Sequence, residues 1–343
     1  MKLNLLDLNR EELKTFVKEE GFPKFRANQI YEWLIKGVKS FDEMTNLPAD
    51  MRSKLEEKAY TGIPEIKKRL QSQLDDTCKY LFCLADGCVI ESVLMKYKYG
   101  YSVCISSQAG CKMGCTFCAS SDIPFSRDLT PGELLGQIIA INRDKDIRIG
   151  HIVMMGIGEP LDNYSNVIKF LKNVQSPEGL AISYRKISLS TCGIVPGINK
   201  LAEENIPITL SVSLHNPYDE QRSVIMPVNR KYSLDKLFEA CNSYIAKTGR
   251  RITFEYSMIS EVNDSLEHAK KLCERLKGML CHVNLIPVNK VPGKEYMRCS
   301  RRRISEFSEV LSSHGISVTV RRELGRDINA ACGQLRKQQM NTD

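Results

Sequence analysis

The sequence has 343 residues, of which 42% are hydrophobic and 26% are charged. A chain of this size and composition can bury a substantial core, so we expect a globular protein with one large domain and a small appendage. No apolar run reaches the roughly 18 residues of a membrane span, and the N-terminus lacks a signal-peptide core, so we expect no membrane association and a cytoplasmic location. The net charge of +8 favours a polyanionic partner.

Apolar residues recur at helical spacing in the first part of the chain. The pattern predicts helices over 11–19, 27–35 and 48–58, separated by proline-containing breaks. We therefore predict a small N-terminal helical accessory domain over residues 1–75.

Residues 79–106 contain short runs rich in β-branched, aromatic and other apolar residues. The segment Ala85-Asp86-Gly87 separates two of these runs and is typical of a hairpin turn. We predict a β-hairpin extension over 76–100 that leads into the main domain.

Strands and helices then alternate along the chain. Strands are predicted at 151–155, 186–190, 208–214, 252–258, 282–287 and 316–321. Helices are predicted near 131–143, 164–174, 195–205, 234–247, 264–277 and 302–313.

Repeated β-α units require parallel strands, and the units here are too few for a closed eightfold barrel. We predict an α/β fold with a partial (β/α)6 barrel, like an incomplete TIM barrel, over 101–290 and a C-terminal extension over 291–343. An open doubly wound sheet would give the same alternation. However, no G-x-G-x-x-G motif opens a helix after a first strand, which argues against a dinucleotide-binding fold.

Three of the 13 cysteines lie close together, as Cys111-Lys-Met-Gly-Cys115-Thr-Phe-Cys118. Structural zinc sites and ferredoxin clusters use four protein ligands, so a tight group of three favours a 4Fe–4S cluster with one iron open to a substrate or cofactor. The alternative is a zinc ribbon whose fourth ligand lies elsewhere. No second C-x-x-C or H-x-x-x-H pattern supports that alternative.

Polar residues occur where several predicted strands end, the place where β/α barrels carry their active residues. They are Gly158 and Glu159, Ser190, the run Ser213-Leu214-His215, and Asn289. Taken alone, each is also typical of an ordinary turn or polar strand end.

The cysteine motif, followed one β-α unit later by Gly-Glu at a strand end, resembles the radical S-adenosylmethionine (SAM) superfamily. Further segments resemble the RlmN/Cfr group of RNA methyltransferases within it, over essentially the whole chain. They are Cys104-Ile-Ser-Ser-Gln-Ala-Gly-Cys111, Met154-Met-Gly-Ile-Gly-Glu-Pro-Leu161, Ser190-Thr-Cys-Gly193, Ser213-Leu-His215, His282-Val-Asn-Leu-Ile-Pro287 and Asp327-Ile-Asn-Ala-Ala-Cys-Gly-Gln-Leu335.

The resemblance implies a 4Fe–4S cluster on Cys111, Cys115 and Cys118, and two SAM molecules per turnover. It implies SAM contacts from Gly158, Glu159, Ser190, Ser213, Leu214, His215 and Asn289.

The reaction that the resemblance implies is methylation of carbon 2 of an adenine, in the peptidyl-transferase region of 23S rRNA and in the anticodon loop of tRNA. One SAM methylates Cys332, and a 5′-deoxyadenosyl radical from a second SAM then activates that methyl group for addition to the base. Cys104 resolves the adduct through a transient disulfide with Cys332, and Glu91 acts as proton acceptor.

The resemblance further implies a monomer that receives electrons from a donor such as flavodoxin or ferredoxin. Two alternatives remain open at this point. One is a Cfr-like enzyme that methylates carbon 8 of the adenine, and the other is a zinc-stabilised RNA-binding protein without catalysis. Two segments depart from the pattern of the group, namely residues 119–129, where relatives carry a glycine-rich stretch, and Lys290, where proline is common.

Overall fold

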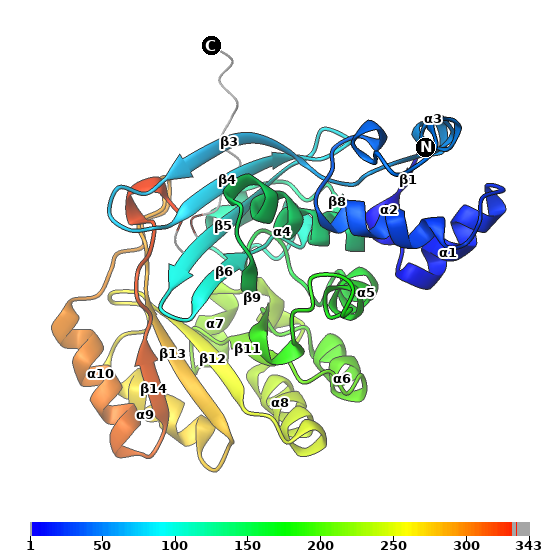
Figure 1. The fold of residues 1–343 in the computed structure, drawn as a ribbon. Coiled ribbons are helices and arrows are strands. Elements are labelled where there is room, and N and C mark those ends of the chain that lie inside the picture. The colour runs from blue at the N-terminus through cyan, green and yellow to red at the C-terminus, as the bar shows by residue number, and fades with distance from the viewer. Residues whose placement is uncertain (1, 331–333, 335–343) are drawn as a thin grey trace.

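A computed structural model of the chain describes residues 2–330 and 334. Its centre is a ten-stranded sheet with the order β14-β13-β12-β11-β10-β9-β6-β5-β4-β3 (Figure 1). Neighbouring strands run parallel from β14 to β6, whereas β5, β4 and β3 continue the sheet in antiparallel pairs. The predicted α/β fold with a mostly parallel sheet is confirmed.

The parallel strands agree closely with those predicted from the sequence. They are β6 (Gly100–Cys104), β9 (Ile149–Met154), β10 (Ile187–Thr191), β11 (Thr209–Ser213), β12 (Ile252–Met258), β13 (Cys281–Pro287) and β14 (Ser317–Val320). The helices between them are α4 (Pro131–Lys145), α5 (Tyr164–Val174), α6 (Val195–Glu203), α7 (Asp219–Ile225), α8 (Leu234–Thr248), α9 (Leu266–Leu276) and α10 (Arg301–Ser313). Of these helices only α7 was not predicted, because its 7 residues are too few to display a helical period.

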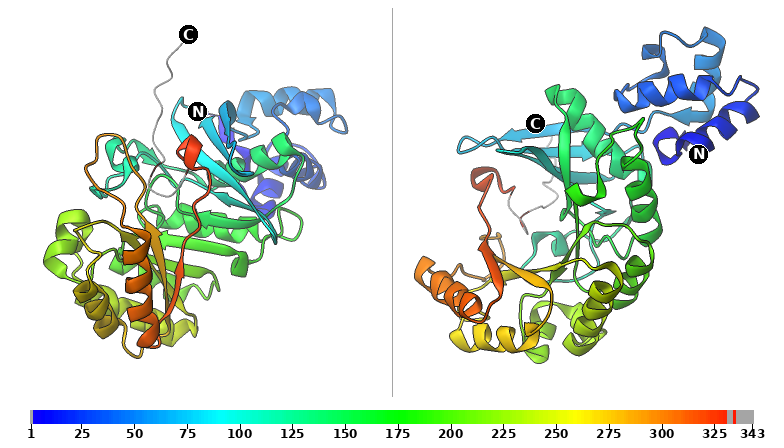
Figure 2. Two further views of the ribbon diagram at one scale, coloured as in Figure 1. Left: turned by 90° about the vertical axis from the view of Figure 1, so that its left-hand side faces the viewer. Right: turned by 60° about the horizontal axis from the view of Figure 1, so that its bottom comes forward.

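The sheet curves into an open crescent with helices along its outer side (Figure 2). All seven residues of the interior strand β12 are buried, as expected for a parallel strand that is covered on both faces. None of the helices in the described part of the chain is long and apolar enough to cross a lipid bilayer.

The three helices predicted near the N-terminus are present. They are α1 (Arg10–Glu19), α2 (Arg26–Ile35) and α3 (Ala49–Lys58), and the short parallel pair β1 (Leu3–Asn4) and β2 (Ala59–Tyr60) joins the two ends of this region. The prediction that residues up to about 75 are helical was wrong at its end, because β3 (Glu65–Gln71) is an edge strand of the sheet. Its two partly buried apolar residues, Ile66 and Leu70, are four apart, a spacing that a helix and a strand share.

The antiparallel part of the sheet contains β3, β4 (Cys78–Cys83) and β5 (Val89–Tyr97), and the predicted turn at 85–87 connects β4 to β5. Strand β6 therefore lies at a junction, pairing with β5 on one side and with β9 on the other. The division of the chain into domains at residues 75, 100 and 290 stays a prediction.

Gln137 of α4 holds the chain that follows β6. Its buried side-chain amide donates to the carbonyl oxygen of Ser106 (3.0 Å) and accepts from the Ser106 N–H (2.9 Å) and the Ser92 hydroxyl (2.7 Å). Because Ser106 lies between Cys104 and Cys111, these bonds fix the start of the segment that carries the predicted cluster ligands.

We expect Gln137→Leu to lower the free energy of unfolding by about 2–6 kcal/mol, because it leaves two buried backbone groups of Ser106 unpaired at about 1–3 kcal/mol each. The matched control is Lys145→Ala at the exposed end of the same helix, which should change the free energy by less than about 0.5 kcal/mol. Urea unfolding of the two variants checks this. Equal effects would contradict the role given to Gln137.

Candidate active site

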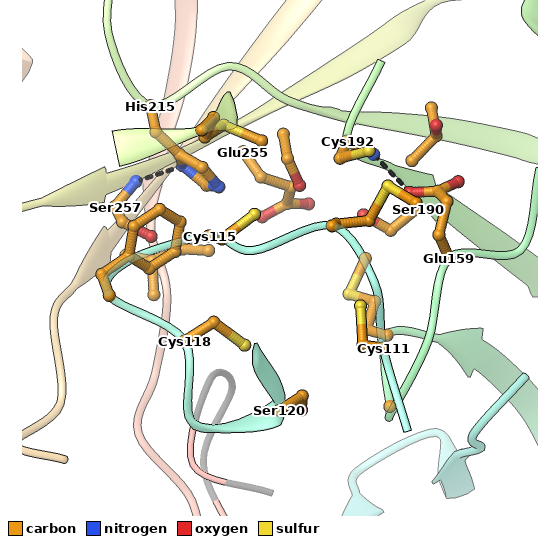
Figure 3. Close-up of a pocket in the computed structure, with 18 of the residues that line it drawn as sticks. Cys111, Cys115, Cys118, Ser120, Glu159, Ser190, Cys192, His215, Glu255 and Ser257 are labelled. Carbon is orange, nitrogen blue, oxygen red and sulfur yellow. Dashed lines mark hydrogen bonds between the residues drawn. The ribbon is translucent and has the colours of Figure 1, made fainter. Parts of the chain in front are cut away.

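One cavity at the C-terminal ends of the parallel strands brings together most of the predicted site residues (Figure 3). Its lining includes Cys111, Cys115, Cys118, Gly158, Glu159, Ser190, Ser213, His215 and Asn289. The strands are parallel, so residues that are far apart in the sequence meet at the same edge of the sheet.

Four predicted residues are not part of this lining. Leu214 is buried in the main hydrophobic core. Glu91 and Cys104 lie on β5 and β6, beside the cavity in the sheet. Cys332 lies outside the described residues.

The loop that carries the three motif cysteines is fixed at both ends. The short antiparallel pair β7 (Gln108–Ala109) and β8 (Arg127–Asp128) joins its ends. In its middle, the N–H of Thr116 donates to the carbonyl oxygen of Ile225 at the end of α7 (3.0 Å). The segment 119–129, which departs from the glycine-rich pattern, contains a 3-10 helix over Ala119–Asp122.

The donor chemistry of the loop fits an iron–sulfur cluster, because three thiol side chains border the same cavity. In the described part of the chain, no three His, Cys, Asp or Glu side chains are close enough to hold a single metal ion. Burial raises the pKa of Cys111 to about 11 and raises that of Cys115 still further. Since metal-bound cysteine is a thiolate, the cations of a bound cluster would have to offset this burial.

Arg222 of α7 is a fully buried residue that the sequence analysis missed. Its guanidinium donates to the carbonyl oxygens of Leu214 (2.9 Å), Cys192 (2.8 Å) and Ser213 (2.9 Å), and to the Asn229 side chain (2.7 Å). Burial lowers the pKa of Arg222 only to about 10, so the group stays charged at neutral pH. A positive charge therefore lies behind the cavity, close enough to Cys115 to affect its thiol.

Glu159 connects the ends of two strands. Its buried carboxylate accepts from the backbone N–H of Leu161 (3.0 Å) and of Cys192 (2.7 Å), and burial raises its pKa despite these bonds. Each carboxylate oxygen can accept a further hydrogen bond, so the group retains capacity for a ligand in the cavity. The preceding Gly158 has φ of +103°, and a Cβ there would lie 2.6 Å from the side chain of Gln108.

His215 is held as a neutral ring. Its Nδ1 accepts from the N–H of Ser257 (2.9 Å), so in the neutral ring the hydrogen is on Nε2. The ring of Phe117 meets it edge to face, with centroids 4.9 Å apart. Burial, together with the charge of Arg222, lowers the pKa of His215 to about 3.

Glu255 is a second cavity residue that the sequence analysis missed. It lies in the middle of β12 and accepts from the side-chain amide of Asn284 (2.7 Å), and burial raises its pKa. A glutamate inside the otherwise uncharged run Ile-Thr-Phe-Glu-Tyr-Ser-Met was a signal in the sequence that could have identified it.

Cys104 packs against a smaller hydrophobic cluster, and Glu91 lies on the same strand as two members of that cluster. Val93 pairs with Cys104 across β5 and β6, and Cys104 packs against the cluster that contains Val93, Met95 and Ala330. Glu91 is two residues before Val93, so its side chain points to the same face of the sheet. Because Ala330 is part of this cluster, the C-terminal segment reaches the cluster at a residue that is two positions before Cys332 in the sequence.

Comparison with known proteins gives matches over the whole chain. Residues 3–61 match the family model of the ribosomal RNA large subunit methyltransferase N-terminal domain, and residues 105–273 match that of the radical SAM superfamily. The chain is 53% identical to the probable dual-specificity RNA methyltransferase RlmN of Clostridium beijerinckii, over 99% of this chain and 96% of that protein. It is 52% identical to the protein of the same name from Desulforamulus reducens, over 98% of this chain and 96% of that protein.

A solved structure is similar over nearly the same length. The crystal structure of a radical SAM methyltransferase from Sphaerobacter thermophilus matches with a TM-score of 0.94 and 41% identity, covering 97% of this chain and 99% of that one.

The neutral state of His215 predicts a specific pH dependence of stability. Its pKa is lowered on folding from 6.5 to about 3, so the unfolded chain binds the proton first. The contribution of neutral His215 to the free energy of unfolding is complete above pH 6.5. It is lost as the pH falls towards 3, at about 1.4 kcal/mol per pH unit. We expect His215→Gln to lack this part of the acid sensitivity in urea unfolding of the cluster-free protein, whereas His314→Gln, at an exposed site, should keep it. Equal slopes for wild type and His215→Gln would contradict the assignment.

Proposed function

Since the chain belongs to the RlmN family of radical SAM RNA methyltransferases, we propose that it methylates carbon 2 of an adenine in the peptidyl-transferase region of 23S rRNA and in the anticodon loop of tRNA. The observation that carries this proposal is the convergence of the three motif cysteines and the polar strand ends on one cavity. The RlmN name of the relatives favours carbon 2 over the Cfr-like alternative at carbon 8. Membership of an enzyme family argues against the alternative of a non-catalytic zinc protein.

Radical SAM proteins use a 4Fe–4S cluster and SAM. In this chain Cys111, Cys115 and Cys118 would hold the cluster. Bound SAM would contact the cavity residues Gly158, Glu159, Ser190, Ser213, His215 and Asn289, with Leu214 supporting them from the core. When bound, the cluster and SAM together would supply a 5′-deoxyadenosyl radical, and two SAM molecules would be used in each turnover.

The protein's own contribution to the chemistry is a pair of cysteines and a carboxylate. The Cys332 thiolate would take a methyl group from SAM, and after loss of a hydrogen atom its methylene radical would add to carbon 2 of the adenine. The adduct radical would give up one electron, which a bound oxidised cluster could accept, and Glu91 would accept the proton that leaves carbon 2. The Cys104 thiolate would then attack the sulfur of Cys332, so that a disulfide forms, the carbon–sulfur bond to the base breaks and the released carbon takes up a proton. Cys104 packs against the cluster that contains Ala330, and this supports the pairing because Ala330 is two residues from Cys332 in the sequence.

The binding partners follow from this chemistry. The net charge of +8 suits the phosphate backbone of 23S rRNA and tRNA, and a base must leave its stack to reach a cavity inside the sheet. Flavodoxin or ferredoxin would supply electrons. We place the protein in the cytoplasm, where these RNAs are found, and expect it to act as a monomer.

Removing one motif thiol should remove the cluster. We expect anaerobically purified Cys115→Ser protein to retain less than about a quarter of the roughly four irons per chain of a 4Fe–4S cluster. Cys192→Ser is the matched control, because Cys192 borders the same cavity but lies outside the motif, and it should keep its iron. Iron and sulfide analysis with absorption spectra measures this. Zinc instead of iron in the wild-type protein would overturn the proposal.

Replacement of Cys332 and replacement of Cys104 should cause different defects in RNA methylation. Cys332→Ala should yield no 2-methyladenosine by nucleoside mass spectrometry, because no methyl carrier remains. Cys104→Ala should accumulate a covalent protein–RNA adduct on a denaturing gel, since the carbon–sulfur bond cannot be resolved. As a control, Cys83→Ala, on β4, should be normal in both assays. An inactive Cys104→Ala protein without an adduct would contradict the role of Cys104.

A further inference from the structure

A lysine is buried in the antiparallel part of the sheet. The side chain of Lys79 on β4 is only 4% exposed, and its ammonium lies 3.7 Å from the carboxylate of Glu91, which is 1% exposed. Burial lowers the pKa of Lys79, and the charge of Glu91 opposes that change. The two charges therefore depend on each other, because each is removed from water beside the other.

The same ammonium also contacts the C-terminal segment. Its Nζ donates to the carbonyl oxygen of Asn329 at 3.4 Å. Asn329 follows the 3-10 helix Arg326–Ile328 and lies three residues before Cys332 in the sequence. One side chain thus contacts both the proposed proton acceptor and the segment that leads to the proposed methyl carrier.

The turn between β3 and β4 holds this segment in place. The carboxylate of Asp327 accepts from the hydroxyl of Ser72 (2.7 Å) and from the N–H of Gln73 (2.7 Å). The N–H of Gly325 donates to Asp75 (3.0 Å). A Cβ at Gly325 would lie 2.7 Å from Thr77, so the backbone needs glycine to approach the turn this closely.

We propose that Lys79 is a positioning residue that keeps Glu91 ionised and ties it to the segment bearing Cys332. This inference rests on the proposed function, because Glu91 must accept a proton there. A buried carboxylate on its own favours its neutral form, which cannot accept a proton, whereas a neighbouring ammonium favours the ionised form. The positive charge of Lys68 on β3 lowers the pKa of Lys79 further, and the titratable Cys104 lies on β6, the strand next to Glu91.

A purely structural ion pair makes a different prediction from a positioning residue. If Lys79 only stabilised the fold, its loss would lower stability and leave the pH dependence of methylation unchanged. If it acts through Glu91, its loss makes the carboxylate harder to ionise, so the acid limb of the pH–rate profile moves to higher pH.

The test measures RNA methylation against pH in single-turnover assays of cluster-loaded protein. We expect Lys79→Met to move the acid limb upward by at least about one pH unit and to lower the rate at neutral pH about tenfold or more. Lys79→Arg, which keeps the charge, should restore the position of the limb. Lys67→Met, which removes an exposed lysine of β3 that pairs with Glu65, is the matched control and should leave the limb unchanged. If Lys79→Met does not fold, Lys79→Gln replaces it.

A second readout concerns the C-terminal segment and needs no catalysis. Thiol alkylation followed by peptide mass spectrometry should show Cys332 reacting several-fold faster in Lys79→Met than in wild type or Lys67→Met. An unchanged alkylation rate would overturn the tie to the segment.

Glu91→Gln separates failure of this inference from failure of the proposed function. If the wild-type protein does not methylate RNA, the proposed function falls. If Glu91→Gln methylates RNA normally, Glu91 is not the proton acceptor, and its role and the inference about Lys79 fall while the proposed methylation stands. If Glu91→Gln is inactive while Lys79→Met keeps the wild-type pH profile, the inference alone is wrong. If Lys79 acts through Glu91, the double variant should be no slower than Glu91→Gln alone.

Discussion

The buried guanidinium of Arg222 is the interaction on which the cavity depends. Parallel strands end with carbonyl oxygens that need hydrogen-bond partners, and one planar group satisfies those of Cys192, Ser213 and Leu214 together. The strand ends thereby stay in register while their side chains face the cavity. The same group places a permanent positive charge near Cys115, one of the three thiols proposed to bind iron as thiolates. Structural support for the strand ends and electrostatic support for the proposed cluster therefore come from one side chain.

Strand β6 lies between the part of the sheet proposed for radical formation and the part proposed for proton transfer. On its parallel side, with β9, lies the cavity proposed for the cluster and SAM. On its antiparallel side, with β5, lie the proposed proton acceptor Glu91 and its lysine. Cys104 ends this strand, and the cysteine loop begins a few residues later. Radical generation and acid–base chemistry are thus assigned to adjacent halves of one sheet, which share a single boundary strand.

Most of the fold could be predicted because apolar residues recur at clear helical or strand spacing along its elements, as the close match of the predicted and observed barrel strands illustrates. The elements and residues that were not predicted were missed for physical reasons. Strand β3 was missed because its apolar spacing suits a helix as well, and α7 because it is too short. Arg222 resembles a solvated surface residue in the sequence, and only the fold shows that carbonyl oxygens surround it. Lys79 was overlooked for the same reason, since its partners are Glu91 and the distant Asn329.

The docking of the C-terminal segment has a consequence for synthesis of the protein. Asp327 binds Ser72 across a separation of 255 residues, so this contact forms only when nearly the whole chain has emerged from the ribosome. The cysteine loop and the strand ends that border the cavity are made earlier. A chain cut short near its end would therefore contain the residues proposed for radical formation but lack Cys332, the proposed methyl carrier.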